Sequence, residues 1–407
     1  MARLTRATSS PNVPMKWSKK FYKYALEHNF FARSGLIGEG VDSCIRVHKD
    51  LTVAKGNKVR MPMTGPLVGV GGGDNFNSVD IMEAYAAYHF DIEIHERGHT
   101  TGVDGPFTQQ LMIEDWPQTA TEKLGDWKGM IMELEIIKAL SGLYNLSTTL
   151  ASVNENAPST ARIAYGGETA AGVIGAKNAV GDGTLLGGAT GGATTDALLS
   201  AETAASYLMG PTFLEFVVDY FMGQEPRPQL LMIEGRPCLL LLMTTRQGLN
   251  FRQNTIYKNR NMYAEVRGSK NPLLSDSLGF WACGEVSVLL KPYGRIESRT
   301  GTGDAAAPPQ EGFVLNTART ATSDQVATGK TVGRALLLGA QSGGIAYGKT
   351  DNGQLFKRFE GDQDNGTKRK PFKGVEWMYG VSSTVFQNEA DTAQPDFAKM
   401  CLDTCQV

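Results

Sequence analysis

No apolar run in the sequence is long enough to cross a membrane. The longest, Cys238 to Met243, has six residues, whereas a membrane-spanning helix needs about 20. The start of the chain carries positive charge but has no apolar stretch behind it, which argues against a secretory signal. We therefore expect a chain that is made in the cytoplasm and has no membrane partner.

Cysteine and histidine are both scarce, with five residues of each. The cysteines are odd in number and widely scattered, which argues against a disulfide framework. Cys401 and Cys405 have a spacing that could supply half of a zinc site, but no second pair of Cys or His residues lies near them in the sequence. The preferred interpretation is a C-terminal turn, and no metal or other cofactor is expected.

Charge is low overall but unevenly distributed along the chain. The formal net charge is −2 over 407 residues. Residues 1–60 contain twelve Lys/Arg and four Asp/Glu, a surplus of eight positive charges, and residues 61–145 contain four Lys/Arg and thirteen Asp/Glu, a deficit of nine. The two stretches could neutralise each other within one chain or between copies, because complementary potentials favour association. The basic stretch could also contact nucleic acid.

A long amphipathic helix is the main element that the sequence predicts. It lies within residues 106–142, and the part after Pro117 would be roughly 38 Å long at 1.5 Å per residue. Asp115 could cap its start and Gly142 could end it. Pro117 could instead split the segment and leave a separate turn or helix over 107–115. The expected core face recurs at three- and four-residue spacing: Leu124, Trp127, Ile131, Leu134, Ile137 and Leu140.

Two elements are predicted before this helix. Residues 15–31 have aromatic side chains at roughly helical spacing with lysines between them, which predicts a short helix that needs a partner surface. Residues 45–63 alternate apolar and polar side chains, which predicts a hairpin. Its tip is placed at Lys55, Gly56, Asn57 and Lys58. Residues 88–95 alternate in the same way, so this whole region is expected to project as an extended loop.

A Gly/Ala-rich stretch follows the long helix and is not expected to contribute to a core. Residues 154–205 are rich in Gly, Ala and Thr, and ten of the twenty-seven residues from 166 to 192 are glycine. Few large side chains are available there for burial. The stretch is therefore predicted to be a long surface loop.

A second core is predicted beyond this stretch. Residues 208–222 have the pattern of a helix, and 229–244 contain two nearly continuous apolar runs about a turn, which predicts strands buried on both faces. Further strands are expected at 285–291 and 372–386, and a helix at 335–340.

Three motifs invite a chemical interpretation, and each has a structural alternative. The glycines of 69–73 resemble a phosphate-binding loop, but Asp74 follows where a cation is needed, so a loop is preferred. Ser342 lies in a partial nucleophile-elbow pattern whose preceding segment is interpreted as helix, not strand. A stripe of metal-ligand types is more typical of a solvated strand face: His89, Asp91, Glu93 and His95. We expect neither an active site nor a metal site, and so no enzyme.

The order of several short motifs resembles a family of tailed-bacteriophage major capsid proteins. No single motif is decisive, but together they occur in the family's order over nearly the whole chain. They are the basic aromatic segment, residues 56–63 (GNKVRMPM), 124–127 (LGDW), 140–142 (LSG), 267–273 (RGSKNPL), 278–279 (LG), 334–341 (RALLLGAQ) and 346–348 (AYG).

This resemblance implies an α+β fold of the Hong Kong 97 type. The expected parts are an N-terminal arm at 1–45, an extended loop at 46–105, a peripheral domain with the spine helix at 106–150, a Gly/Ala-rich insertion at 151–205, most of the axial domain at 206–332, and the remaining elements with C-terminal strands at 333–407. The expected arm contacts are Lys16, Trp17, Lys19, Lys20, Phe21 and Lys23.

The same resemblance implies a structural protein that assembles into hexamers and pentamers of an icosahedral head around double-stranded DNA. It would be built in the cytoplasm of a bacterial host and reside in the virion. DNA contact would be non-specific and electrostatic. A separate scaffolding protein is expected because the arm begins almost at residue 1, and portal and decoration proteins are further expected partners. The alternatives are an encapsulin-like cellular shell around an enzyme cargo, and a hydrolase that would rest on the weak motifs alone.

Overall fold

The chain is described here by a computed structural model. The described residues are 29–48, 56–64, 87–102, 116–141, 162–168, 174–178, 207–224, 227–233, 235–261, 273, 277–294, 296, 298–300, 331–348, 356–363, 370–387 and 393–406. Residues 15–28 of the predicted basic helix and the glycines at 69–73 lie outside them, whereas Phe30 and Phe31 begin a short helix. Within these ranges, no helix is both long enough and apolar enough to cross a membrane.

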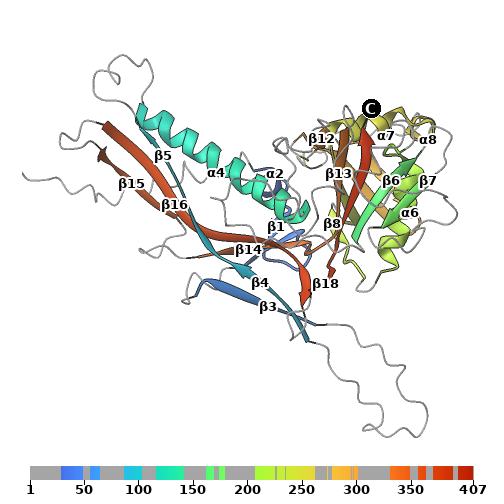
Figure 1. The fold of residues 1–407 in the computed structure, drawn as a ribbon, viewed down its shortest axis with the longest axis horizontal. Coiled ribbons are helices and arrows are strands. Elements are labelled where there is room, and N and C mark those ends of the chain that lie inside the picture. Colours follow the sequence, from blue (N-terminus) through green and yellow to red (C-terminus); the bar gives the residue numbers. More distant parts are fainter. Residues whose placement is uncertain are drawn as a thin grey trace, which may run out of the picture.

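One half of the molecule is elongated and combines the longest helix with a six-stranded sheet. Helix α4 (Trp116–Ser141) runs beside the long strands of this sheet (Figure 1). Strand β16 is the centre, because it pairs with β5 and β15 along one part and with β14 along another. The strands are β1 (Ile37–Gly38), β2 (Ile45–His48), β5 (His95–Gly102), β14 (Gly343–Tyr347), β15 (Phe356–Gln363) and β16 (Lys370–Ser383).

Helix α4 begins at Trp116, one residue before Pro117, and residues 107–115, where a separate turn or helix is the alternative, lie outside the described ranges. Pro117 is the second residue of the helix, where its missing N–H has no intrahelical partner to lose. Leu124, Ile137 and Leu140 of the expected stripe are buried, whereas its three other residues retain some exposure. Ile136, on another side, is also fully buried. The C-terminal half of α4 is therefore enclosed on more than the single face that the sequence pattern indicates.

The other half is a nine-stranded sheet with helices, which we call the nine-stranded domain. Its strands are β6 (Ile163–Glu168), β7 (Ile174–Asn178), β8 (Leu231–Ile233), β9 (Arg236–Met243), β10 (Gly279–Cys283), β11 (Val286–Pro292), β12 (Ser298–Thr300), β13 (Thr331–Leu338) and β19 (Lys399–Gln406). Its helices are α6 (Pro211–Met222), α7 (Thr245–Gln253) and α8 (Thr255–Asn261). All six residues from Cys238 to Met243 are fully buried, so this apolar run is a central strand with both faces covered, as predicted.

Three expectations about this domain are wrong. Residues 335–340, expected as helix, lie mostly in strand β13, because a short buried apolar run does not distinguish a helix from a central strand. Part of the Gly/Ala-rich stretch belongs to the core, since β6 pairs with β19 and Ile163 and Ala164 are buried. Cys401 and Cys405 lie in strand β19, not in a turn, and both are buried with free thiols.

A four-stranded sheet carries the projecting hairpin and is called the hairpin sheet. Its order is β18 (Ala393–Asp396), β17 (Val385–Gln387), β4 (Ala87–Glu93) and β3 (Lys58–Thr64). The predicted pairing of 45–53 with the strand after Lys58 is wrong, because β3 pairs with β4 and β2 pairs with β1 and β14. Lys58 pairs with Glu93, whereas Thr64 pairs with Ala87 next to the connecting segment. Gly56, Asn57 and Lys58 therefore lie at the root of the hairpin, and their assignment to its tip is wrong.

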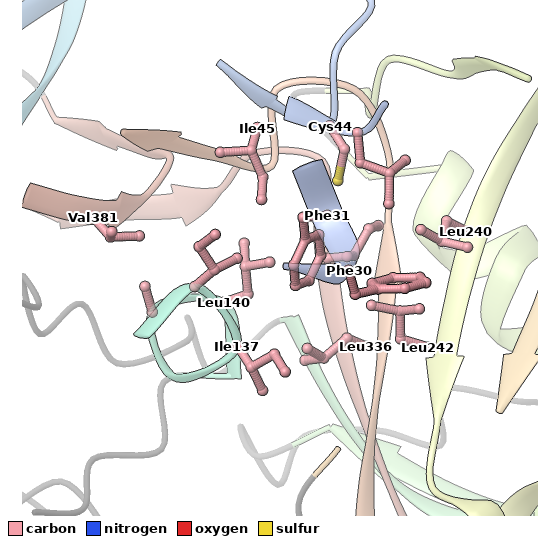
Figure 2. Packing of buried hydrophobic residues seen from close by; sticks show 14 of the residues in the cluster. Phe30, Phe31, Cys44, Ile45, Ile137, Leu140, Leu240, Leu242, Leu336 and Val381 are labelled. Carbon is pink, nitrogen blue, oxygen red and sulfur yellow. The ribbon is translucent and has the colours of Figure 1, made fainter. Parts of the chain in front are cut away.

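A single hydrophobic cluster joins the two halves of the molecule. Figure 2 shows side chains from the short helix α2 (Phe30–Arg33), the end of α4, and both large sheets meeting at one place. Phe31 is fully buried, and Ile137 and Leu336 are each 1% exposed. Because both halves contribute to one core, we expect them to move as one body.

Candidate functional site

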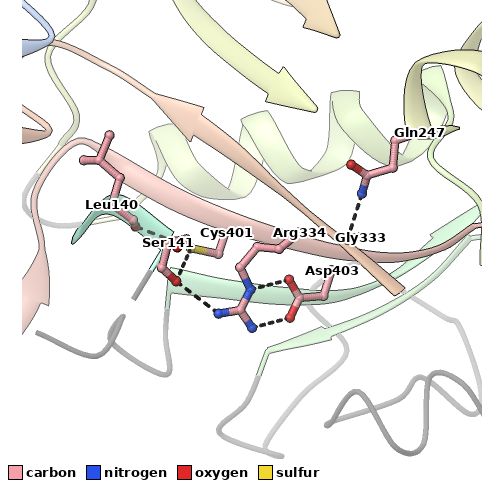
Figure 3. A network of polar contacts seen from close by, with 7 residues as sticks. All are labelled: Leu140, Ser141, Gln247, Gly333, Arg334, Cys401 and Asp403. Atoms are coloured by element: carbon pink, nitrogen blue, oxygen red, sulfur yellow. Dashed lines mark hydrogen bonds and ion pairs between the residues drawn. The ribbon is translucent and has the colours of Figure 1, made fainter. Parts of the chain in front are cut away.

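Buried polar contacts attach the end of α4 to the nine-stranded domain. Arg334 of β13 donates from Nε to Asp403 of β19 over 2.7 Å, and its Nη1 donates to the carbonyl oxygen of Ser141 over 3.1 Å (Figure 3). Ser141 is the last residue of α4, where helix carbonyls lack intrahelical partners. A cation there also complements the negative end of the helix dipole. Arg334 thus neutralises Asp403 and also caps the C-terminal end of α4.

A thiol and an amide complete this joint. Cys401 Sγ lies 3.9 Å from the carbonyl oxygen of Leu140 and 3.8 Å from that of Ser141. Burial raises the pKa of the Cys401 thiol to about 11, so the group stays protonated and inert near neutral pH. On the other side of the sheet, Gln247 Nε2 donates to the Gly333 carbonyl and to Thr404 Oγ1, each over 2.8 Å.

Glu133 of α4 joins the N-terminal segment to the nine-stranded domain. Its Oε2 accepts from the backbone N–H of Phe30 over 2.8 Å, and its Oε1 accepts from the hydroxyl of Tyr293. The Phe30 and Tyr293 rings stack with their centroids 4.5 Å apart. Glu133 is 1% exposed, so its charge is held by these hydrogen bonds and not by water. Asn29, which caps α2, completes the attachment with a side-chain contact of 3.5 Å to the Gly129 carbonyl.

The hairpin sheet rests on glycine positions of β14 and β16. A Cβ at Gly380 would lie 1.8 Å from the Glu93 carbonyl oxygen, and a Cβ at Gly344 would lie 2.8 Å from Ile92 Cδ1. Gly380 therefore requires glycine, because the atom that approaches it belongs to the backbone, whereas a side chain at Gly344 would displace the end of the Ile92 side chain. Phe90 and Ile92 of β4 are buried against this surface, with Ala346 in the same cluster. We call Gly344, Gly380 and Ala346 the hairpin seat.

The opposite face of the hairpin carries cross-strand charge pairs near its root. Arg60 donates to both oxygens of Asp91 over 2.9 and 3.0 Å, and Lys58 Nζ lies 3.0 Å from Glu93 Oε1. The hydrogen bond from Arg60 lowers the pKa of Asp91, and the one to Glu93 raises the pKa of Lys58. Residues directly opposite on an antiparallel pair contribute to pairing, so these ion pairs favour the observed register.

The candidate chemical groups are engaged in structural contacts. Asp91 and Glu93 form ion pairs with the Lys58 side chain. The described ranges hold no group of three His, Cys, Asp or Glu residues that could bind a metal ion. His99 stacks on Trp127 with ring centroids 4.3 Å apart. Ser342 is fully buried, with its Oγ 2.7 Å from the carbonyl oxygens of both Gly339 and Ala398. Its preceding segment is strand, contrary to expectation, but strand β14 and not a helix follows it.

The remaining site residues divide between the described and undescribed parts of the chain. The expected arm residues and Lys55 lie outside the described ranges: Lys16, Trp17, Lys19, Lys20, Phe21 and Lys23. The joint residues Glu133, Arg334 and Asp403 were not singled out from the sequence. Their signal is weak, since Glu133 is one of several charged residues of α4, and only the fold brings Arg334 and Asp403 together across 69 residues.

Comparison with known proteins identifies the family. The family model described as phage capsid protein matches residues 5–406. The capsid of Ralstonia phage GP4 superposes with a TM-score of 0.64 at 19% identity, covering 93% of this chain and 91% of that chain. The cyanophage Pam1 capsid has a TM-score of 0.60 at 18% identity, covering 93% and 92%. The capsid of the Helicobacter pylori bacteriophage KHP30 has a TM-score of 0.56 at 13% identity, covering 91% and 89%. A sequence search of curated proteins finds no match.

These likenesses confirm the α+β phage capsid fold of the Hong Kong 97 type. The family model covers nearly the whole chain. The chain belongs to the phage capsid protein family.

Proposed function

We propose that this chain is the major subunit of an icosahedral head, assembling as hexamers and pentamers around double-stranded DNA. The observation that carries the proposal is the joint at the end of α4, where Arg334, Glu133 and one shared core connect the elongated half and the nine-stranded domain. A shell needs subunits of reproducible shape, because each symmetric contact repeats any error in geometry.

The same structure supports a role without catalysis. The Oγ of Ser342 is buried against two carbonyl oxygens, and Asp91 and Glu93 are engaged in ion pairs. A subunit of this kind acts through area and complementarity, with many modest intermolecular contacts added over a closed shell. Scaffolding, portal and decoration partners, and assembly in a bacterial cytoplasm, stay predictions.

Electron microscopy of the expressed chain tests the proposal directly. The chain, produced alone and together with the other head proteins of its phage, is expected to form closed shells of uniform diameter. A monodisperse monomer under both conditions would contradict the proposal. Shells that hold a host enzyme and exclude DNA would instead favour an encapsulin-like compartment.

The basic arm offers a separate test of assembly. Replacing Lys16, Lys19, Lys20 and Lys23 with Glu is expected to prevent shell formation while the subunit stays folded, because the arm would lose its complementarity to acidic surfaces. The matched control replaces the same four lysines with Arg, which keeps the charge. Shells at normal yield from the Glu variant would show that the positive surplus of the arm is not used in assembly.

A further inference from the structure

Helix α6 presents an acidic surface with an exposed aromatic ring. Glu215, Phe216 and Asp219 are exposed, and their spacing places them on neighbouring positions of one side of the helix. Phe216 is 42% exposed although it is large and apolar. No Lys or Arg occurs in α6. We call these three residues the acidic surface.

The acidic surface is held in one conformation by the core beneath it. Glu215 Oε1 accepts a hydrogen bond from the indole N–H of Trp281 over 2.9 Å, and Trp281 is 3% exposed. On the other side of α6, Phe213 and Phe221 are fully buried. A charge that is already oriented loses little conformational entropy on binding, so this surface is preorganised for a partner.

Helices α7 and α8 present the complementary surface. Arg246, Leu249 and Arg252 are exposed at three-residue spacing along α7, and Ile256 and Lys258 are exposed on α8. Leu249 is 48% and Ile256 46% exposed. Residues 235–264 contain no Asp or Glu. We call these five residues the basic surface.

The two surfaces lie on different parts of the same domain. Figure 1 shows α7 and α8 at the top of the nine-stranded domain and α6 below them. Each surface combines one sign of charge with exposed apolar side chains, and the signs are opposite. A two-fold contact would pair both surfaces of one copy with the same partner and would close after two copies. A head-to-tail contact pairs opposite charges, and repeated head-to-tail contacts generate closed rings when the rotation allows.

We propose that the acidic surface of one copy docks on the basic surface of the next copy around the ring of a capsomer. The inference rests on the proposed shell function and names the surfaces through which neighbouring nine-stranded domains meet. The apolar side chains Phe216, Leu249 and Ile256 form the centre of the contact, and the charges around them set its direction and register.

A second copy fits the basic surface better than packaged DNA does. Phosphate contacts need cations but gain little from Leu249 and Ile256, which are each nearly half exposed. DNA would also leave Phe216 and Asp219 without an intermolecular contact. A second copy covers both surfaces with one kind of contact.

Charge reversal with reciprocal rescue tests the inference. Asp219→Lys gives α6 a positive charge opposite Arg252, and Arg252→Glu gives α7 a negative charge opposite Asp219. Both side chains are exposed, so each variant should fold with an unchanged circular dichroism spectrum and melting temperature. Each single variant is expected to lower the yield of shells at least tenfold, because like charges then meet at every contact of the ring. The variant that carries both substitutions in one chain is expected to recover assembly, since every contact regains opposite charges.

The matched control is Glu285→Lys, an exposed charge reversal in the turn between β10 and β11, outside both surfaces. It is expected to assemble at the yield of the unmodified chain. Single variants that assemble normally, or a folded double variant that does not recover, would overturn the inference. Shells of Arg252→Glu that form normally but hold less DNA would overturn it in favour of a DNA-facing surface. Failure of the unmodified chain to form shells would instead contradict the proposed function.

Discussion

The nine-stranded domain and the hairpin sheet are held in place by different means. In the domain, strands β9, β13 and β19 are covered on both faces, and Leu240, Leu337 and Leu402 are fully buried. In the hairpin sheet, Phe90 and Ile92 are buried on one face, whereas Arg60 and Asp91 form an ion pair on the other. The domain can therefore rely on its own apolar volume, but the hairpin depends on the surface beneath it.

Because of this difference, we expect the domain to determine the stability of the subunit and the hairpin seat to determine the direction of the hairpin. Loss of volume in a core covered on both faces affects the free energy of unfolding of the whole cooperative unit. The hairpin contributes less apolar area, and its direction is set by the close approach of Glu93 to Gly380. Substitutions in the domain should lower stability, whereas substitutions at the hairpin seat should also change the angle at which the hairpin leaves the subunit.

The largest effect is expected from removing one member of the buried ion pair in the domain. Asp403 is fully buried and Arg334 is 3% exposed. Asp403→Ala leaves the guanidinium without its carboxylate in a water-excluded site, so the free energy of unfolding should fall by about 3–5 kcal/mol. Denaturant unfolding followed by circular dichroism measures this loss.

The control replaces both charges in one chain, with Arg334→Met and Asp403→Leu. Well-packed apolar replacements of a buried pair are often close to neutral. The double variant should therefore recover most of the stability, apart from the bond to the Ser141 carbonyl. A double variant as unstable as Asp403→Ala would show that the ion pair stabilises the fold in a way that apolar packing at the same positions cannot replace.

The second prediction concerns the hairpin seat. Gly380→Ala would place a Cβ 1.8 Å from the Glu93 carbonyl oxygen, which belongs to the backbone and must shift. We expect a loss of about 1–3 kcal/mol and a much larger loss of shell yield. In β5, Gly98→Ala is the control, because its Cβ would lie 3.4 Å from the nearest atom, the Val375 carbonyl oxygen. Normal shells from Gly380→Ala would show that the seat does not set the hairpin angle.

The third prediction concerns Lys128, a buried cation of the elongated half. Lys128 of α4 is 8% exposed, and its Nζ lies 5.1 Å from the centre of the Trp377 ring. Burial lowers the pKa of Lys128 to about 8, below its ordinary value of about 10.4. The unfolded chain therefore binds the proton more tightly between pH 8 and 10, and stability should rise with pH across this window.

Lys128→Met removes this titration and should raise stability at pH 7 by about 1–2 kcal/mol, since the cost of a buried charge is offset only in part by the aromatic ring. Urea unfolding at pH 7, 8, 9 and 10 measures this difference between the wild-type chain and Lys128→Met. A wild-type stability that stays constant over this range, or a Met variant that keeps the rise, would contradict the prediction.

Long, regular patterns were predictable from the sequence. The stripe on α4 and the run from Cys238 to Met243 identify their elements because each pattern is complete within the segment itself. The same local reasoning could not select the partner of β3. Twenty-two residues lie between the end of β3 and the start of β4, and the nearby strand β2 pairs with β14 across nearly 300 residues.

Glycine content led to a wrong prediction at one position and gave no prediction at another. Gly167 contributed to the expectation of a surface loop, yet it lies in strand β6. Glycine is needed there because a Cβ would lie 2.2 Å from the Tyr207 backbone. Gly380 has no signal in the sequence as the seat of the hairpin, since the Glu93 backbone reaches it from a distant part of the chain. Close backbone approach depends on tertiary structure, and composition cannot distinguish it from flexibility.

The smallest expected effect concerns the charge pair on the exposed face of the hairpin. Asp91→Asn keeps the shape of the side chain but removes its charge opposite Arg60, which is 60% exposed. Exposed pairs of this kind contribute about 0.2–1 kcal/mol, so faster hydrogen exchange of β3 and β4 amides should be the main result, with global stability almost unchanged. Arg60 lowers the pKa of Asp91, so the contribution is fully present above the ordinary carboxyl pKa and is lost as pH falls through the lower folded value. The difference between wild type and Asp91→Asn should accordingly disappear in acid and shrink at high salt. Equal exchange rates in both chains at pH 7 and low salt would show that packing on the seat alone holds the hairpin register.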